Sequence, residues 1–236
     1  MELSNTKAIL LLGGKGTRIQ SITNGMPKAM LKIQGKTTPE YLIQLFKKYG
    51  ITNLIFSVGY KAKVIKDYYG DGSRFGVAIT YVEEDEPLGS AGAIKLASKH
   101  IKNTFFVTNG DELKVIDLKD MMEYHNTNKG IITVALTEVV DPSHYGVARL
   151  DGNRILEFVE KPKTNASSNF VNSGLSIWEP AVIRMIPDGF CMYEKELFPR
   201  LASEGKLVGY KFSGQWFDTG TPERYERANE EWRGGL

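Results

Sequence analysis

An apolar strand near the start of the chain runs directly into a glycine-rich loop. Residues 7–12 read Lys-Ala-Ile-Leu-Leu-Leu, and Gly13, Gly14, Lys15, Gly16, Thr17 and Arg18 follow them. Three glycines in four positions let the backbone turn tightly and leave its N–H groups accessible. Such groups bind anions, and the helix expected to follow adds the positive end of its dipole. With Arg18 and Lys28 as cations, the segment predicts a site for the phosphates of a nucleoside triphosphate.

Two other phosphate-binding loops do not match this segment. The ATPase and GTPase loop has the form GxxxxGK[ST], which is absent from the sequence. The dinucleotide form GxGxxG fails because Ile19 stands where the third glycine is required. A tight strand-to-helix connection is the alternative explanation of the glycines. The presence of Arg18 and of the pair Pro27-Lys28 favours the phosphate site over a plain turn.

The composition limits the class of protein and the kinds of partner. Hydrophobic residues make up 42% of the 236 residues and charged residues 25%, as in ordinary globular proteins. The 30 basic and 28 acidic side chains leave no basic excess for a polyanion, so we expect no nucleic acid partner. No signal pattern or apolar run of membrane-spanning length is found, so we expect no membrane association. The single cysteine, Cys191, fits a reducing compartment and predicts a cytoplasmic protein.

Strand and helix patterns alternate in the first half of the chain. Apolar runs predict strands over residues 8–12, 53–58, 77–82 and 104–108, and helices over 38–49, 62–69 and 91–99. Thr38 is the predicted N-cap of the first of these helices, with Pro39 at its first position and Gly50 after its end. This alternation predicts parallel βαβ units, which bind ligands beyond the carboxyl ends of their strands.

The second half is richer in strands. They are predicted over 131–137, 147–150, 155–160, 170–178 and 208–212, with helices near 180–185, 194–202 and 222–232. The change of pattern near residue 115 predicts one α/β domain, 1–236, built from two halves that share a core. Residues 1–115 would bind the nucleotide and residues 116–236 the second substrate.

Two carboxylates are candidates for a magnesium site. Asp111 follows a predicted strand and the small residue Gly110, and Asp218 precedes the C-terminal helix, which Thr221 and Pro222 would begin. Mg²⁺ binds through one or two carboxylates together with phosphate oxygens and water. Turn formation is the alternative role of Asn109-Gly110-Asp111, since all three residue types favour turns. A magnesium site therefore requires the fold to bring Asp111 and Asp218 together.

Residues of the second half offer groups for a sugar phosphate. Lys161 stands at a strand end before Pro162, where a cation can meet a phosphate, and Glu160 can accept hydrogen bonds from hydroxyl groups. A solvated Glu-Lys pair is the alternative. Asn172 lies in a strand interrupted by Gly174, which indicates a bulge or the close approach of a ligand. Gly146 can present its backbone to a sugar hydroxyl.

Taken together, these segments resemble the sugar-1-phosphate nucleotidyltransferases, or nucleotide-sugar pyrophosphorylases, and most of all the guanylyltransferases of mannose or manno-heptose 1-phosphate. Eight motifs occur in family order over nearly the whole chain: GGKGTR at 13–18, PK at 27–28, EPLGSAGA at 86–93, NGD at 109–111, YGV at 145–147, FVEKP at 158–162, NSG at 172–174 and WFDTGTPERY at 216–225. The resemblance implies a three-layer α/β/α, Rossmann-like fold with a mixed, mostly parallel sheet, the nucleotide-diphospho-sugar transferase fold.

The resemblance also implies a reaction and roles for particular residues. The enzyme would combine an NTP with a sugar 1-phosphate to form an NDP-sugar and pyrophosphate, with Mg²⁺ as cofactor, in nucleotide-sugar and polysaccharide biosynthesis. The implied nucleotide-binding residues are Leu12, Gly13, Gly14, Gly16, Thr17, Arg18, Lys28, Leu88, Gly89 and Asp111. Gly146, Glu160, Lys161 and Asn172 would bind the sugar phosphate, and Asp111 and Asp218 the metal. Arg18, Lys28, Asp111, Lys161 and Asp218 would be the catalytic set.

The base and the sugar remain open at the level of sequence. EPLGSAGA favours GTP, whereas Ala29 replaces the proline that usually follows Pro27-Lys28 in the family. A cytidylyl- or uridylyltransferase acting on another phosphorylated metabolite is one alternative, and a catalytically silent regulatory subunit is another. A glycosyltransferase of similar fold usually has an Asp-x-Asp motif, and residues 109–111 offer one carboxylate. No left-handed β-helix extension is present, so we expect no second acetyltransferase activity. Assembly into a homo-oligomer is compatible with the sequence.

Overall fold

The computed structural model describes residues 2–163 and 166–234, and the chain forms two compact units. The N-terminal unit comprises Glu2–Pro87, Thr108–Ile116 and Gly214–Leu236, and the central unit comprises Leu88–Val107 and Asp117–Ser213. Strand β6 (Phe105–Asn109) leads from the central unit into the N-terminal unit. Among the described residues, no helix combines the length and the apolar character needed to cross a bilayer.

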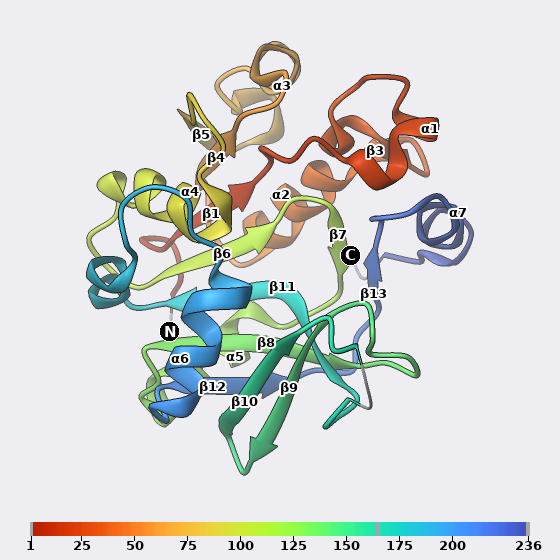
Figure 1. The fold of residues 1–236 in the computed structure, drawn as a ribbon. Helices are drawn as coiled ribbons and strands as arrows, with labels where there is room; N and C mark the ends of the chain where they lie inside the picture. Colours follow the sequence, from red (N-terminus) through yellow and green to blue (C-terminus); the bar gives the residue numbers. More distant parts are fainter. Residues whose placement is uncertain (1, 164–165, 235–236) are drawn as a thin grey trace. The chain divides into compact units, whose positions relative to one another are not determined.

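Three parallel strands form the sheet of the N-terminal unit, in the order β5 (Ala78–Glu83), β4 (Asn53–Val58), β1 (Lys7–Leu11) (Figure 1). Ala8, Ile9 and Leu10 of β1 have no exposed surface, as expected for a strand covered on both faces. The predicted parallel βαβ arrangement of this half is confirmed. Because parallel strands end at one edge of a sheet, the glycine loop after β1 lies at their carboxyl ends.

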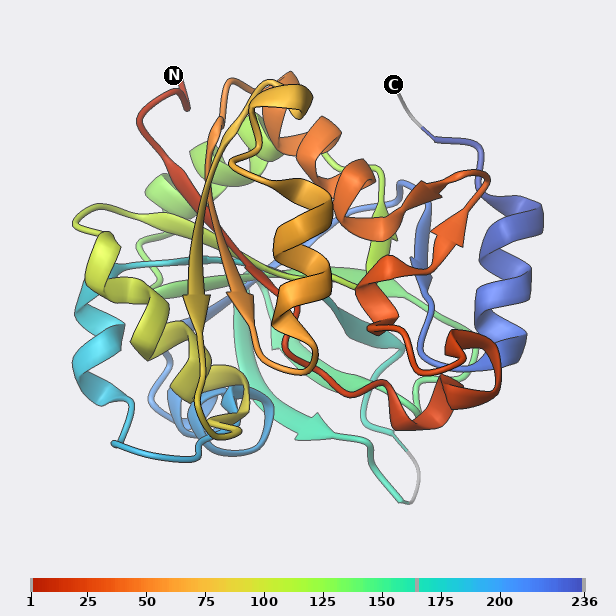
Figure 2. The same cartoon turned by 90° about the horizontal axis from the view of Figure 1, so that it is seen from above.

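Helices α2 (Thr38–Lys48) and α3 (Ala62–Tyr69) belong to this unit, and Figure 2 shows α3 lying alongside the three strands. Tyr69 of α3 packs edge-on against Phe56 of β4, with ring centroids 5.3 Å apart. The predicted cap of α2 was wrong by one residue. Thr37 is the N-cap rather than Thr38, because the Glu40 carboxylate accepts the Thr37 backbone N–H at 2.7 Å and completes a capping box.

Two small antiparallel ribbons and the last helix complete the N-terminal unit. Strand β7 (Glu112–Lys114) pairs with β13 (Trp216–Asp218), and β2 (Lys32–Ile33) pairs with β3 (Lys36–Thr37). Helix α7 (Pro222–Glu231) has the predicted Thr221 cap. The remaining short helices are η1 (Thr17–Ile19), α1 (Gln20–Thr23), η2 (Lys28–Met30) and η3 (Ser73–Phe75).

The central unit holds a mixed sheet in the order β6, β11 (Phe170–Trp178), β8 (Ile132–Glu138), β12 (Leu207–Lys211), β10 (Arg154–Glu160), β9 (Gly146–Asp151). Strand β12 is parallel to β8, whereas β11 is antiparallel to β8 and β10 is antiparallel to both of its neighbours. The mixed α/β class is confirmed, with parallel pairing concentrated in the N-terminal unit. Antiparallel pairing prevails here, and the two-residue turn Gly152-Asn153 between β9 and β10 leaves no room for a crossover helix.

Helices pack on both faces of this sheet: α5 (Leu118–Asn128) against β8 and β12, and α6 (Phe198–Ser203) against β10 and β12 (Figure 1). The unit also contains α4 (Gly89–Ala97), the 3₁₀ helices η4 (Ser98–His100) and η5 (Pro180–Met185), and the π-helical turn η6 (Tyr193–Leu197). Buried aromatic rings fill the interior; Phe198 lies 5.2 Å from Phe158 and 4.7 Å from Tyr193, between centroids.

Candidate active site

The glycine loop leaves β1 with an accessible backbone. Gly14 is exposed, and a Cβ placed on it would have no other atom within 4 Å. Gly16 has φ +61°, and a Cβ there would lie 3.0 Å from Cβ of Lys28, so both conformation and space require glycine. Helical structure follows the loop as expected, but it is short: a three-residue 3₁₀ turn and the four-residue α1. Since such short helices have little dipole, they add little to the attraction that the predicted phosphate site would need.

Lys28 connects the two predicted metal carboxylates. Its ammonium forms an ion pair with Asp111 Oδ2 and lies 4.0 Å from Asp218 Oδ1. The ribbon of β7 and β13 explains the approach, because Asp218 pairs in register with Glu112, the residue after Asp111. Thr219 strengthens the link by donating its hydroxyl to the Asp111 backbone carbonyl at 2.8 Å. The structure therefore brings Asp111 and Asp218 together, as the magnesium hypothesis requires.

The lysine controls the charge of Asp111. Burial opposes ionisation of this carboxyl, but the Lys28 ammonium and its hydrogen bond outweigh burial and lower the Asp111 pKa below its ordinary value. Asp111 is consequently a carboxylate at neutral pH, which is the form that a metal or an ammonium binds.

These donors fit magnesium. The two carboxylates converge on a single cation, and side chains of Asp111 and Asp218 are 35% and 13% exposed, so a substrate can reach them. Among the described residues no group of three or more His, Cys, Asp and Glu side chains could hold a metal by itself. Two carboxylates with the remaining positions left to phosphate and water is the arrangement that Mg²⁺ accepts.

Two arginines lie beside this cluster. Arg224 of α7 donates from Nη1 to Asp218 Oδ2 at 2.6 Å. The Arg18 guanidinium approaches Gly220, with Nη2 3.2 Å from the position that a Cβ would take there. Arg224 lies in the motif WFDTGTPERY, but no role was predicted for it from the sequence. Its contact with Asp218, six residues earlier, forms because α7 packs against β13.

In the central unit, Leu88 and Gly89 begin α4 and are tied to the segment at Cys191. The Cys191 N–H donates to the Leu88 carbonyl at 2.9 Å, and the Cys191 carbonyl accepts from Ala91 at 2.9 Å. Gly89 has φ +70°, and a Cβ there would strike the Cys191 backbone. The turn at Leu88-Gly89 is therefore a rigid one.

The predicted sugar-binding residues Gly146 and Glu160 lie side by side. They are paired in register on β9 and β10, and a Cβ on Gly146 would lie 2.9 Å from Glu160 Oε2. Lys161 Nζ is 3.0 Å from Glu160 Oε1, and the Lys161 side chain is 52% exposed. The structure thus combines a half-exposed cation and a carboxylate at one end of the hairpin, whereas the Gly146 backbone beside them is buried.

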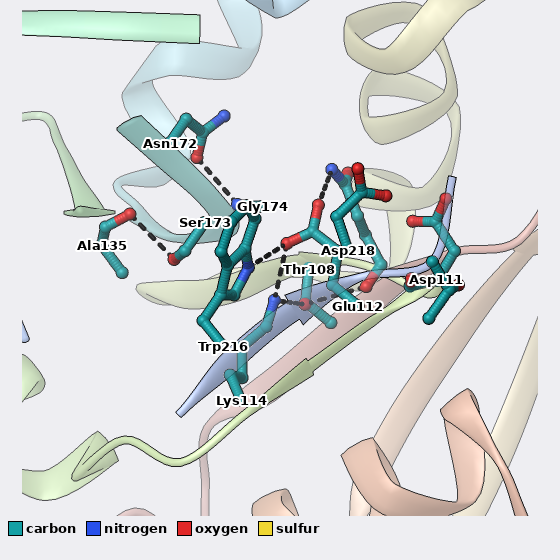
Figure 3. Close-up of polar contacts among 12 residues, drawn as sticks. Thr108, Asp111, Glu112, Lys114, Ala135, Asn172, Ser173, Gly174, Trp216 and Asp218 are labelled. Carbon is teal, nitrogen blue, oxygen red and sulfur yellow. Dashed lines mark hydrogen bonds and ion pairs between the residues drawn. The ribbon is translucent and has the colours of Figure 1, made fainter. Parts of the chain in front are cut away.

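Asn172 lies where β11 departs from regular pairing with β8, between Asn172 and Ser176. Its Oδ1 accepts the Gly174 N–H at 2.9 Å, and Ser173 donates its hydroxyl to the Ala135 carbonyl at 2.9 Å (Figure 3). Of the two interpretations of Gly174, the bulge is confirmed. At the bulge, the Asn172 amide oxygen therefore forms a hydrogen bond within its own strand.

Sequence reasoning missed a second acidic residue in the central unit. Ser90 donates its hydroxyl to Glu194 Oε2, and burial raises the pKa of the Glu194 carboxyl above its ordinary value of 4.5. Glu194 was predicted as a helix start without a function. No local sequence signal reveals such a half-buried carboxyl, because its burial depends on how α4 and η6 pack.

The fold is an α/β fold with an open glycine loop and a cluster of one lysine and two carboxylates, and comparison identifies the family. A family model described as Nucleotidyl transferase matches residues 7–234, and the chain belongs to that family. It is 35% identical over 236 residues to a mannose-1-phosphate guanylyltransferase of Mycobacterium tuberculosis, covering 98% of this chain and 66% of that protein. It is 34% identical to a mannose-1-phosphate guanylyltransferase catalytic subunit beta of Danio rerio, covering 93% of this chain and 62% of that protein.

Solved structures agree with the family. HddC from Yersinia pseudotuberculosis superposes with a TM-score of 0.84 at 29% identity, and the match covers 97% of this chain and 100% of that chain. A further structure of HddC contains GMP-PN. A putative glucose-1-phosphate thymidylyltransferase from Bacillus anthracis superposes with a TM-score of 0.81 at 28% identity, covering 95% of this chain and 94% of that chain. These neighbours confirm the predicted nucleotide-diphospho-sugar transferase fold, while this chain spans 62–66% of the curated relatives named above.

Proposed function

We propose that this protein transfers a guanylyl group from GTP to a mannose-like or manno-heptose-like sugar 1-phosphate, forming a GDP-sugar and pyrophosphate. The supporting observation is the cluster of Lys28, Asp111 and Asp218 within the unit that contains the open glycine loop. The choice of GTP rests on the guanylyltransferase names of the curated relatives.

The proposed chemistry needs no protein nucleophile. A phosphate oxygen of the sugar 1-phosphate attacks the α-phosphorus, and the bond from that phosphorus to the pyrophosphate oxygen breaks as pyrophosphate leaves. The protein supplies position and positive charge. Loop N–H groups at Gly14 and Gly16 with the Arg18 guanidinium hold the triphosphate, and Lys28 neutralises the α-phosphate.

The central unit supplies the other contacts in this proposal. Leu88 and Gly89 lie along the base and ribose. The backbone hydrogen bonds to Cys191 hold this turn in place, which favours a role as a fixed contact surface. Glu160 accepts sugar hydroxyls beside the Gly146 backbone, Asn172 adds an amide, and Lys161 holds the sugar phosphate. Half of the Lys161 side chain is exposed, which leaves the ammonium accessible to an anion.

Asp111 and Asp218 are the proposed magnesium ligands. When bound, Mg²⁺ supplies charge neutralisation at the triphosphate oxygens. The two aspartates present ionised oxygens to it, and Arg224 holds the second Asp218 oxygen in place at 2.6 Å.

We also infer a cytoplasmic location, which suits a chain whose Cys191 is a free thiol and whose proposed substrates are NTP and sugar 1-phosphate.

The function is tested by pyrophosphate release with Mg²⁺, crossing GTP, CTP, UTP, dTTP and ATP with a panel of sugar 1-phosphates. Release with GTP and mannose or heptose 1-phosphate is the expected result. Release with another base alone would replace guanylyl transfer by cytidylyl, uridylyl or a related transfer. Silence throughout, with nucleotide binding retained, would favour a regulatory subunit.

The metal assignment has its own test. Asp111→Asn and Asp218→Asn are each expected to lower kcat by roughly 100-fold or more, because each removes an ionised metal ligand. Asp151→Asn, at an exposed position of β9, is the control and should leave kcat unchanged. Wild-type kcat in both variants would show that these carboxylates do not bind the metal.

A further inference from the structure

The ribbon of β7 and β13 has one apolar and one charged face. Successive strand residues point to opposite faces, so directly paired residues share a face. Leu113 and Phe217 pair with each other, and their side chains pack in an apolar cluster with Ile33, Ala228 and Trp232. Glu112 pairs with Asp218, and Lys114 pairs with Trp216, on the opposite face.

Figure 3 shows how the charged face is bonded. Glu112 Oε1 accepts from the Asn109 amide at 2.9 Å, and Glu112 Oε2 accepts from the Trp216 indole at 2.9 Å. Lys114 Nζ lies 3.5 Å from Glu112 Oε2 and donates to the Thr108 hydroxyl at 3.1 Å. Each of these four contacts joins the segment around Asp111 to itself or to the strand that ends at Asp218.

The ion pair of Glu112 and Lys114 is buried, which costs both charged groups their hydration. The Lys114 side chain is 0% exposed and that of Glu112 9% exposed. Burial raises the pKa of Glu112 and lowers that of Lys114, and nearby Asp111 and Asp218 add repulsion at Glu112. Apolar residues of similar volume commonly replace a buried ion pair without loss of stability, so stability alone does not account for this one.

We propose that the Glu112–Lys114 pair is a positioning element that holds Asp111 and Asp218 at the separation needed to share a divalent cation. It acts on Asp111 through the adjoining backbone and on Asp218 through the ladder and the Trp216 indole. This inference rests on the metal assignment in the proposed function. The pair belongs to the protein's interior, so neither side chain contacts substrate.

The test measures metal binding directly. We compare the wild-type protein with a Glu112→Gln/Lys114→Met double variant, using Mn²⁺ in the presence of a guanosine triphosphate with a methylene α,β-bridge. Electron paramagnetic resonance of free Mn²⁺ reports the Kd, and thermal unfolding reports the fold. The matched control is Glu204→Gln/Lys206→Met, which removes a Glu-Lys ion pair with the same spacing from a surface turn, where N and O are 2.7 Å apart.

The double variant is expected to bind Mn²⁺ roughly 10-fold more weakly with its melting temperature retained, because residues that orient metal ligands typically contribute 10- to 100-fold to affinity. Trp216→Phe, which removes the indole donor and keeps Lys114 paired, should weaken Mn²⁺ binding in the same direction and serves if the double variant does not fold. Wild-type affinity in either folded variant overturns the positioning role while leaving the proposed function intact. Failure of the wild-type protein to bind Mn²⁺ overturns the metal assignment and the positioning role together.

Discussion

Lys161 directly follows β10, with φ +49° and a half-exposed side chain. We expect Lys161→Ala to raise the KM for sugar 1-phosphate by roughly 10- to 100-fold, since a charge-assisted hydrogen bond contributes about 1.5–3 kcal/mol. The KM for GTP should stay constant, as should both constants in the exposed Lys163→Ala control. Steady-state kinetics with each substrate varied decides the matter, and equal increases in both KM values would show that Lys161 does not bind the sugar phosphate.

Glu194 predicts a pH dependence of stability. Because burial raises its pKa in the folded protein, the folded state binds a proton more tightly than the unfolded state. Its contribution to the free energy of unfolding therefore falls as pH rises above about 4.5. Glu194→Gln keeps an acceptor for Ser90 and should match wild-type stability near pH 4 but exceed it at pH 8.

Urea unfolding at the two pH values provides the measurement, with exposed Glu138→Gln in β8 as control. A stability difference that does not grow between pH 4 and pH 8 would contradict a raised pKa of Glu194 in the folded protein.

The individual residues that were singled out from the sequence lie in short motifs, whereas those that were missed do not. Arg18, Lys28, Asp111 and Asp218 stand in short motifs, where residue type and neighbouring glycines predict a role. Glu112 and Lys114 look like ordinary surface charges in the sequence, because charged residues are almost never buried without a partner. Their partnership exists only after β7 and β13 pair.

At the scale of elements, α5 was not predicted even though its cap is local. Asp117 Oδ1 accepts the backbone N–H groups of Lys119 and Asp120 at 2.9 and 3.0 Å. The helix carries His125, Thr127 and two Asn residues, which have weak helix propensity, so tertiary packing of Leu118, Met121 and Met122 decides it. The four strands predicted in the first half match β1, β4, β5 and β6 within a residue, because continuous apolar runs between turn residues have few other solutions. The short strands β2, β3 and β7 were not predicted.

The cap of α5 gives the prediction at this scale. Asp117→Ala should lower the free energy of unfolding by about 1 kcal/mol, because two helix N–H groups lose their acceptor. The Lys119→Ala variant changes an exposed residue two positions after Asp117. It retains the Asp117 acceptor and should have near wild-type stability. Urea unfolding of both variants gives the comparison, and equal stabilities would mean that water replaces the cap without cost.

For the whole molecule, ligand binding and stability are coupled. A ligand that binds the folded state alone, present at 100 times its Kd, adds about 2.7 kcal/mol to stability. For a chain of this length that corresponds to a rise in melting temperature of roughly 5–10 °C. We expect this rise with Mg²⁺ and GTP together, and a smaller one with Mg²⁺ and CTP at the same concentrations.

Differential scanning calorimetry measures the rise, with Mg²⁺ alone as the reference. Equal shifts with GTP and CTP would remove the preference for guanine while leaving nucleotide binding in place. The division of substrates between residues 1–115 and 116–236 stays a prediction, because it depends on which bound ligand contacts which residues.

The family, the α/β class and the longer strands β1, β4–β6 and β8–β12 could be predicted from the linear sequence, whereas the short strands β2, β3, β7 and β13 were missed. These features depend on neighbours within a few residues: apolar periodicity, glycine conformational freedom and motif order. The meeting of Asp111 with Asp218 and the burial of Glu112 with Lys114 depend on pairing between segments about 100 residues apart, as in Glu112 with Trp216, which are 104 residues apart. Tertiary folding decided them because strand register and burial, rather than residue type, set the distance and the dielectric environment between charges.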